Sequence, residues 1–294
     1  MILINRNLQK IKEFIIEKLI LICGLASIFF VLLIFLFLLK EGLSLFKIIT
    51  PGQFLLGKSW YPISEPAQLG ILPLILGSLM VTVGAAIISI PIGVACAVYI
   101  AEIAPLKIKE ILKSGIELLA AIPSVVIGFV GMVTLVPWVK TIFHLPTGLT
   151  AFSGSIMLAF MAMPTIVSIA EDALYAVPKN YKEGALALGA THWQAIYRVM
   201  LPAASSGILA AVMLGIGRVI GETMAVMMIT GNAAAMPSSI LQPVRTLTAT
   251  IAAEMGEAVI GSEHYFALFA VGIVLFIFSF AINVSADLFL HKRK

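Results

Sequence analysis

The chain has 294 residues, of which 61% are hydrophobic and 12% are charged. So few polar side chains cannot cover a soluble globular protein of this length, which excludes that class and predicts an integral membrane protein. The formal net charge is +4, and the basic residues stand between long apolar runs. This distribution indicates membrane topology and contact with anionic lipid head groups, and not nucleic-acid binding.

Six apolar runs are long enough to cross a membrane as helices. They cover roughly residues 18–39, 70–100, 114–139, 149–177, 200–230 and 265–290. The runs are continuous and not alternating, and a helix satisfies its backbone polar groups within one segment, so helices are favoured over a β-barrel. We expect an all-α membrane protein with about six transmembrane helices.

The order of these runs predicts two parts. Residues 1–69 would contain a cytoplasmic N-terminus, a retained first span and an external segment, and residues 70–294 would form one membrane domain. Basic residues cluster on one predicted side of the membrane, at 6–18, 107–113, 179–198 and 292–294. The positive-inside rule makes that side cytoplasmic, so both termini are predicted to be cytoplasmic.

The external segment contains a misleading motif. Residues 52–59, GQFLLGKS, fit the phosphate-binding pattern G-x-x-x-x-G-K-[ST]. A nucleotide-binding loop of this kind follows a strand and opens a helix in an α/β domain, for which this segment is too short. We therefore expect no nucleotide site and no cofactor here. The chain would not be an enzyme, and any ATP-driven work would fall to a partner.

A polar break at residues 178–202 separates the fourth run from the fifth. Pro178 suits the first turn of a helix, and Gly189 can end that helix in a left-handed conformation. Thr191 and Gln194 then fit a capping box that starts a second helix. The pattern predicts a two-helix projection, the knuckle, with a shape that fits a groove on a soluble partner. It resembles the "EAA" loop of ABC-importer permeases, through Glu183-Gly184-Ala185, Gly189 and Val199-x-Leu201-Pro202.

The fifth run carries two charges in the sequence Gly217-Arg218-Val-Ile-Gly221-Glu222-Thr223. On a continuous helix this spacing places Arg218 and Glu222 on one face, one turn apart. Each charge at the bilayer centre costs about 2.5–3.5 kcal/mol on insertion scales, so the pair must face a bundle interior or an aqueous path. Either the two charges neutralise each other, or Arg218 lines the route of an anionic substrate. Gly217 and Gly221 would let another backbone come close.

Three motifs together resemble the phosphate-specific ABC transporter permeases. They are residues 217–226 (GRVIGETMAV), 121–129 (AIPSVVIGF) and the spaced pattern at 91–105. Met224-Ala225-Val226 and Thr230-Gly231-Asn232 favour the PstC-type subunit over the PstA-type. Gly184 and Val199 depart from the residues usual in the family, Ala and Ile.

The resemblance implies a type I ABC-importer permease fold with a cytoplasmic coupling helix, in the inner membrane of a prokaryote. It also implies a heterodimer with a PstA-type permease, two copies of a PstB-type ATPase and an external phosphate-binding protein. The implied site residues fall into two groups. The substrate path would use Arg218, Glu222, Thr223 and Ser124, and the ATPase-coupling loop would use Glu183, Gly184, Ala185 and Gly189.

Three alternatives stay open from the residues alone. An ABC permease for sulfate or molybdate would serve an oxyanion equally well with Arg218. A secondary transporter or channel would use Arg218 and Glu222 without ATP, and a structural assembly subunit would use neither. The histidines lack metal-ligand spacing, so no metal site is expected. Glu171 and Asp172 are interpreted as a solvated helix end, and Trp60 as an interfacial residue, while Glu254 receives no role.

Overall fold

The computed structural model describes the backbone of residues 2–291, and side-chain environments from residue 13 onward except at 286, 287 and 289–291. The basic residues at 292–294, which are predicted to be cytoplasmic, lie outside this range. The α-helices, in chain order, are α1 (Ile2–Ser44), α2 (Pro51–Leu56), α3 (Leu72–Val98), α4 (Leu106–Ala121), α5 (Ser124–Ile142), α6 (Ala151–Tyr175), α7 (Lys179–Ala187), α8 (His192–Ala195), α9 (Leu201–Ala203), α10 (Ser205–Gly221), α11 (Met224–Ile229), α12 (Leu247–Glu254) and α13 (Glu263–His291).

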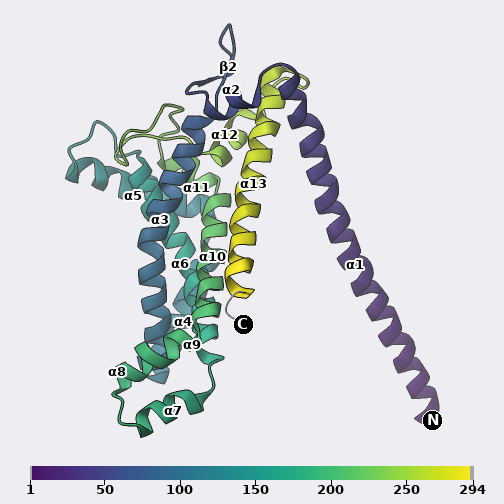
Figure 1. Ribbon diagram of the computed structural model, residues 1–294, viewed down its shortest axis with the longest axis vertical. Coiled ribbons are helices and arrows are strands. Elements are labelled where there is room, and N and C mark those ends of the chain that lie inside the picture. Colours follow the sequence, from purple (N-terminus) through teal and green to yellow (C-terminus); the bar gives the residue numbers. More distant parts are fainter. Residues whose placement is uncertain (1, 292–294) are drawn as a thin grey trace.

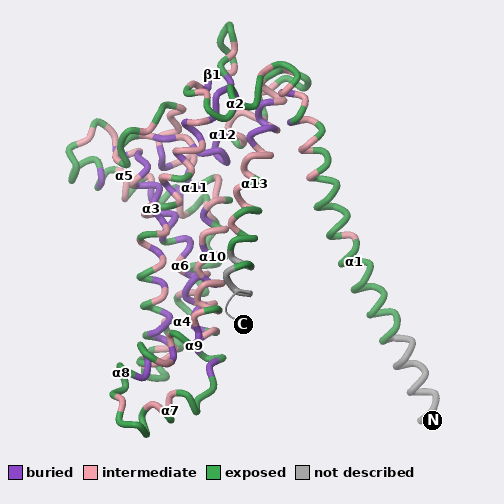
Figure 2. Tube along the Cα trace, viewed as in Figure 1, coloured by how far each residue is buried: buried purple, intermediate pink, exposed green. Residues whose placement is uncertain are grey.

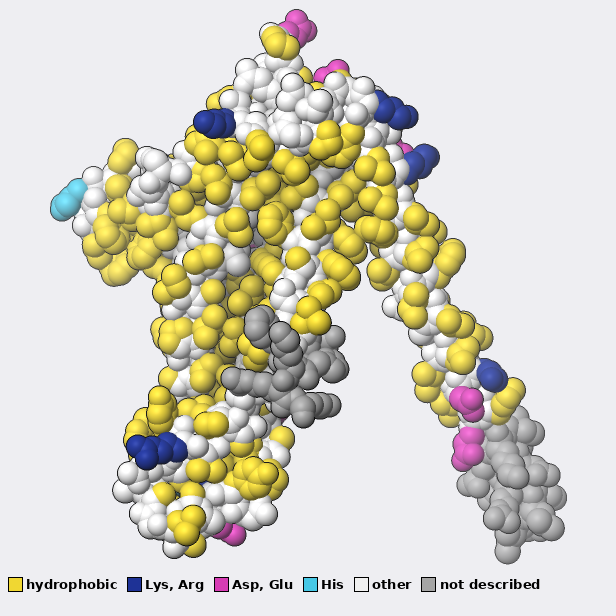
Figure 3. Space-filling model, viewed as in Figure 1, with side chains coloured by type: hydrophobic (Ala, Val, Ile, Leu, Met, Phe, Trp, Pro, Cys, Tyr) yellow, Lys and Arg dark blue, Asp and Glu magenta, His cyan; other side chains and the backbone are white. Residues whose placement is uncertain are grey.

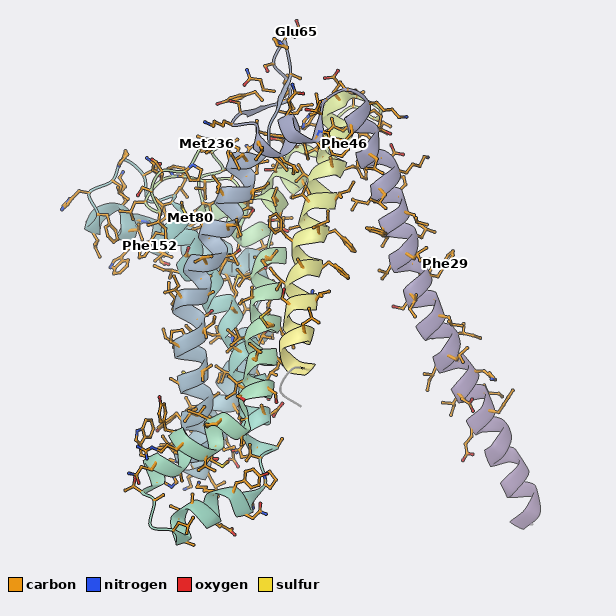
Figure 4. The ribbon with its side chains drawn as sticks, in the orientation of Figure 1. Phe29, Phe46, Glu65, Met80, Phe152 and Met236 are labelled. Atoms are coloured by element: carbon orange, nitrogen blue, oxygen red, sulfur yellow. The ribbon has the colours of Figure 1, made fainter. Side chains whose placement is uncertain are left out.

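Three short helical turns and one small hairpin complete the described fold. The turns are the 3-10 turn η1 (Leu45–Lys47) and the π-helical turns η2 (Tyr99–Ile103) and η3 (Ile196–Met200). Strands β1 (Trp60–Tyr61) and β2 (Gln68–Leu69) pair antiparallel, with Trp60 opposite Leu69. Glu65 lies at the tip of this hairpin (Figure 4).

The long helices form an elongated bundle with two different ends (Figure 1). The end that carries β1 and β2 is called the hairpin end, and the end that carries α7 and α8 is called the knuckle end. The N-terminus of α1 lies toward the knuckle end, and α13 runs from the hairpin end in the same direction. Helix α1 packs on α13 near the hairpin end, where Gly42 approaches Ile273, and then diverges from the bundle.

Five described helices are long and apolar enough to cross a membrane, and a bent pair, α8–α9 with α10, supplies a sixth. The bend in that pair is 69°. Hydrophobic side chains cover the middle of the bundle and the upper part of α1, whereas charged side chains gather toward the two ends of the described surface (Figure 3). The predictions of a helical membrane protein and of about six spans are therefore confirmed.

Two predicted spans are interrupted. The run at 114–139 is not one helix, because it divides into α4 and α5 at Ile122–Pro123. Proline disfavours the helical conformation of the residue before it, and Ile122 is extended, with φ −69° and ψ 127°. Helix α4 has only 16 residues, so only α5 is long enough to be a span in its own right. The run at 200–230 is also divided, between α10 and α11 at Glu222 and Thr223, where there is no proline.

Helix α6 lies at the centre of the bundle, where most of its residues are buried (Figure 2). Its Ile166 is held between two glycines of neighbouring helices, Gly93 on α3 and Gly215 on α10. A Cβ at Gly93 would lie 2.8 Å from Ile166 Cγ2, and one at Gly215 would lie 2.5 Å from Ile166 Cγ1. These glycines let three helices pack at close range, as small residues do in membrane bundles.

The external segment forms a cap on the hairpin end. Phe54 of α2 and Trp60 of β1 are buried against Leu247 and Leu268, which belong to α12 and α13. Trp60 is only 2% exposed, so its ring packs against protein and not against lipid head groups. The motif at 52–59 lies partly within α2, and it does not form a loop between a strand and a helix.

Candidate functional site

Arg218 lies in the last turn of α10, and its side chain reaches α6. Its Nη1 donates a hydrogen bond to Thr165 Oγ1 at 3.3 Å. Arg218 remains exposed on the surface of the isolated chain, and the described residues include no ion pair for it. A neutral hydroxyl satisfies only one of the five donors of a guanidinium, so the others stay open to an anion.

Glu222 is not part of the helix that carries Arg218. Helix α10 ends at Gly221, and Glu222 is extended, with φ −70° and ψ 132°. Its carboxylate accepts a hydrogen bond from the backbone N–H of Ala225, in the first turn of α11, at 3.4 Å. The predicted continuous helix through both charges is therefore wrong, and no ion pair joins Arg218 and Glu222 among the described residues.

The break between α10 and α11 is held by hydrogen bonds from two directions. Thr223 Oγ1 donates to the carbonyl of Gly221 at 3.2 Å, within the break. Thr248 Oγ1, on α12, donates to the carbonyl of Glu222 at 2.9 Å. In a membrane, irregular backbone is tolerated only where protein or a water-filled path satisfies it. The break therefore has the properties of a site inside the protein, not of a lipid-facing segment.

Ser124 is the first residue of α5, directly after Pro123. Helix α5 packs against α11, since a Cβ at Gly128 would lie 2.9 Å from Ala225 Cα. The structure thus brings the start of α11 beside α5. Glu222 and Thr223 lie together in the break between α10 and α11, whereas Arg218 is hydrogen-bonded to α6. Among the hydrogen bonds of the described chain, none joins Ser124 to these three residues.

The face of α10 around Arg218 is uncovered. A Cβ added at Gly217 or at Gly221 would meet nothing within 4 Å. Leu214 is 52% exposed and Met224 43% exposed on the flanks of these glycines. These glycines were predicted to let another backbone come close. Within the described part of this chain no backbone approaches them, and the space beside them is open.

The knuckle has the predicted local structure. Helix α7 starts directly after Pro178, which is its N-cap and not part of its first turn. Gly189 follows with φ +84°, and Thr191 and Gln194 form the capping box that begins α8. Glycine adopts this left-handed conformation without the steric cost that other residues carry.

The four predicted coupling residues lie on or just after α7, which has no buried residue. Glu183, Gly184 and Gly189 are exposed and Ala185 is half-buried. Leu188 beside them is 91% exposed. Tyr181 and Leu186 of α7 are exposed as well, so the knuckle carries several uncovered apolar side chains.

Charged clusters at both ends of the bundle were not predicted. Glu171 is 1% exposed and lies 3.9 Å and 3.7 Å from the amines of Lys109 and Lys113 on α4, so its interpretation as solvated is wrong. Its neighbour Asp172 is exposed, as predicted. The run of lysines at 107–113 is the one feature of the sequence that indicates this cluster, and it does not reveal that Glu171 is their partner.

At the hairpin end, Glu254 is the centre of a second cluster. Its carboxylate pairs with Arg245, accepts from the indole N–H of Trp60 at 3.0 Å, and lies 2.9 Å from Nε2 of His264. These contacts attach the hairpin to α12 and α13. Trp60 and Glu254 are 194 residues apart, so no local pattern could reveal the contact.

The fold and the two polar features define a multi-pass membrane permease of the ABC-importer class. Residues 89–294 match the profile of the binding-protein-dependent transport system inner membrane component. The chain belongs to this family. Among solved structures, it is similar to an inward-facing MetNI methionine ABC transporter, with TM-score 0.61, 20% identity and coverage of 79% of this chain and 100% of the other. A bacterial alginate ABC transporter gives TM-score 0.62 at 16% identity, covering 92% and 93%.

Relatives in sequence are closer. A probable ABC transporter permease protein, YqgH, of Bacillus subtilis is 40% identical over 99% of this chain and 94% of its own length. The phosphate transport system permease proteins PstC of Mesorhizobium japonicum and Haemophilus influenzae are 35% and 34% identical. They cover 82% and 83% of this chain and 78% and 82% of their own lengths. The predicted family and fold are confirmed.

Proposed function

We propose that this chain is the permease subunit of an ATP-driven importer and forms the membrane path for inorganic phosphate delivered by an external binding protein. The observation that carries the proposal is Arg218, a permanent cation on an apolar span whose single described hydrogen-bond partner is a neutral hydroxyl. The similarity to phosphate permeases over about four fifths of the chain supports the choice of phosphate.

The chemistry of Arg218 suits an oxyanion. A guanidinium gives two parallel hydrogen bonds to phosphate, and it cannot lose its charge in the membrane. Phosphate carries between one and two negative charges near neutral pH, so it compensates the charge of Arg218 during passage. Glu222 and Thr223, at the break, and Ser124, at the start of α5, are the further residues that we assign to this path.

The assembly we infer is a heterodimer with a second, PstA-type permease, two PstB-type ATPases and a phosphate-binding protein. The uncovered face around Gly217 and Gly221 supports a second permease, because a charged face cannot be left against lipid. The exposed knuckle supports an ATPase partner on its side of the membrane. That side is then cytoplasmic, with both termini, and the chain itself hydrolyses no ATP.

In this mechanism the binding protein releases phosphate into the path between the two permeases. Closure of the ATPases displaces Glu183, Gly184, Ala185 and Gly189, and the helices rock so that the path opens to one side at a time. No bond of phosphate is broken.

Replacement of Arg218 tests the proposal. We expect Arg218→Ala and Arg218→Glu, in the assembled transporter in vesicles, to lower uptake of labelled phosphate by about tenfold or more, since a hydrogen bond to a charged group contributes about 1.5–3 kcal/mol. Lys140→Ala removes a cation outside the path and serves as the control.

Unimpaired uptake by both Arg218 variants would refute the role of this residue. Competition with sulfate and molybdate separates the substrates. If the vesicles take up sulfate or molybdate and phosphate does not compete with that uptake, the transporter serves another oxyanion. Uptake that persists without an ATPase subunit would instead identify a secondary transporter.

A further inference from the structure

Helix α7 is only loosely packed on the rest of the chain, where it meets η3 and α8. None of its residues is buried, and a hollow of about 380 Å³ lies between it and the ends of α3 and α6. Val177, Lys179 and Leu186 line this hollow, together with Glu102. Because this packing is loose, a polar or covalent connection is expected to strengthen the transmission of a displacement of α7 to the bundle.

Covalent connections join α7 to only two parts of the bundle. The chain enters α7 from α6 through residues 176–178, and it leaves through Gly189 toward α8, η3 and α10. Helix α3 ends at η2 and is not adjacent to α7 in sequence. Apolar packing joins α3 to α6, and a direct contact between η2 and the knuckle would add a second connection.

Glu102 of η2 provides that contact. Its carboxylate lies 2.5 Å from Nζ of Lys182 on α7, and the two side chains are 8% and 28% exposed. The backbone carbonyl of Glu102 also lies 3.4 Å from Nε2 of His192 on α8. One residue at the end of α3 thus contacts both helices of the knuckle. Because the pair is largely shielded from water, its attraction is screened less than that of a surface ion pair.

The turn that holds Glu102 is anchored in the apolar core. In η2 the N–H of Ala104 bonds to the carbonyl of Tyr99 at 2.8 Å, which closes a wide π-helical turn. Ile100 on this turn is 2% exposed, and Ile196, which opens the second π-helical turn, is 0% exposed in the same apolar cluster. Single π-helical turns within helices are frequent at functional sites. A force on Glu102 is therefore transmitted to packed residues of α3 and not absorbed by a free end.

We propose that the Lys182–Glu102 ion pair transmits the displacement of the knuckle to α3, which makes both residues positioning residues for coupling ATP hydrolysis to transport. The proposal rests on the proposed function as an ATP-driven importer. It adds a second route to the covalent one, so that α3 and α6 move together when α7 is displaced.

The experiment uses the complete transporter in vesicles with Glu102→Gln, Lys182→Met and the charge-exchanged double variant Glu102→Lys/Lys182→Glu. The measured quantity is the ratio of ATPase rates with and without the loaded binding protein. We expect each single variant to lower this ratio by about fivefold or more, and the exchanged pair to recover most of it, as for a partly buried ion pair. Lys179→Met, on the same helix and beside the same hollow, should leave the ratio unchanged.

Two results would overturn the proposal. One is a normal ratio in both single variants. The other is an exchanged pair no better than the singles, because the loss then reflects disturbed folding and not the pair. If the phosphate-loaded binding protein fails to stimulate even the unaltered transporter, the assigned substrate is wrong, and the ion pair is tested separately. Hydrogen exchange of residues 180–188 in the substrate-free assembly should then accelerate in E102Q and K182M but not in K179M, and equal exchange in all three would refute the link.

Discussion

At the scale of single residues, Gly189 is the position where backbone conformation decides the shape of the knuckle. Its φ of +84° lies in the left-handed region, and a Cβ there would meet nothing within 4 Å. Steric contact with neighbours is therefore not the constraint. The constraint is the conformation itself, which costs an L-residue about 1–2 kcal/mol.

We predict that Gly189→Val displaces α8 relative to α7 and lowers stimulation of the ATPase by the loaded binding protein. The control is Gly115→Ala, because Gly115 also has open space around it but lies in the interior of α4, outside the knuckle. Alanine there should stabilise the helix by about 0.5–1 kcal/mol and preserve stimulation. Equal stimulation in the two variants would show that the left-handed turn does not matter for coupling.

At the scale of elements, the break between α10 and α11 depends on a distant hydroxyl. Thr248 donates to the carbonyl of Glu222, and its oxygen lies 3.1 Å from Oγ1 of Thr246. Loss of a hydroxyl that satisfies a buried carbonyl costs about 1–3 kcal/mol.

Thr248→Val should therefore lower the melting temperature of the purified assembly and reduce uptake, because valine keeps the shape of threonine and removes both contacts. Thr134→Val is the control, since the hydroxyl of Thr134 donates only to the carbonyl of Val130 in its own helix. A melting curve for T248V that matches the T134V curve would mean that the break is stable without this bond.

The elements also show which parts of the fold the sequence predicts. The knuckle is predictable because its signals are local: Gly189 and the Thr191–Gln194 box act within a few residues. The boundary between α4 and α5 could have been predicted from Pro123, because proline disfavours a helical conformation of the residue before it. It was missed because the residues on both sides are apolar and look like one span. The division at Glu222 was not predictable, because it depends on Thr248, 26 residues further on.

The candidate site divides in the same way. Arg218 is conspicuous in sequence because a cation on an apolar span is costly. Its partner Thr165 lies 53 residues away on another helix, and the predicted partner Glu222 caps α11 instead. Periodicity correctly identified which residues are unusual, but only the packing of α6 against α10 determines which of them meet.

At the scale of the whole molecule, the chain alone is an incomplete transporter. Its bundle is closed around α6, yet the side of α10 that carries Arg218 is open, and α1 leaves the bundle beyond its contact with α13 (Figure 1). At the hairpin end, the side chains around Glu254 line a hollow of about 540 Å³. The open side of α10 makes the bundle asymmetric and indicates that part of the missing surface lies along the membrane-spanning face.

This asymmetry gives a prediction for the face around Arg218. Leucine at Gly217 or Gly221 meets no atom of its own chain within 4 Å of the added Cβ, so the isolated subunit should fold normally. If a second permease packs on this face, both Gly217→Leu and Gly221→Leu should reduce the amount of that permease recovered with the tagged chain. Gly52→Leu has equally open surroundings but lies outside the spans, on α2, and should leave recovery unchanged. Phosphate uptake is measured on the same preparations. Full recovery together with undiminished uptake in both variants would show that the face contacts neither a partner nor the substrate, whereas full recovery with reduced uptake would assign the face to the path alone.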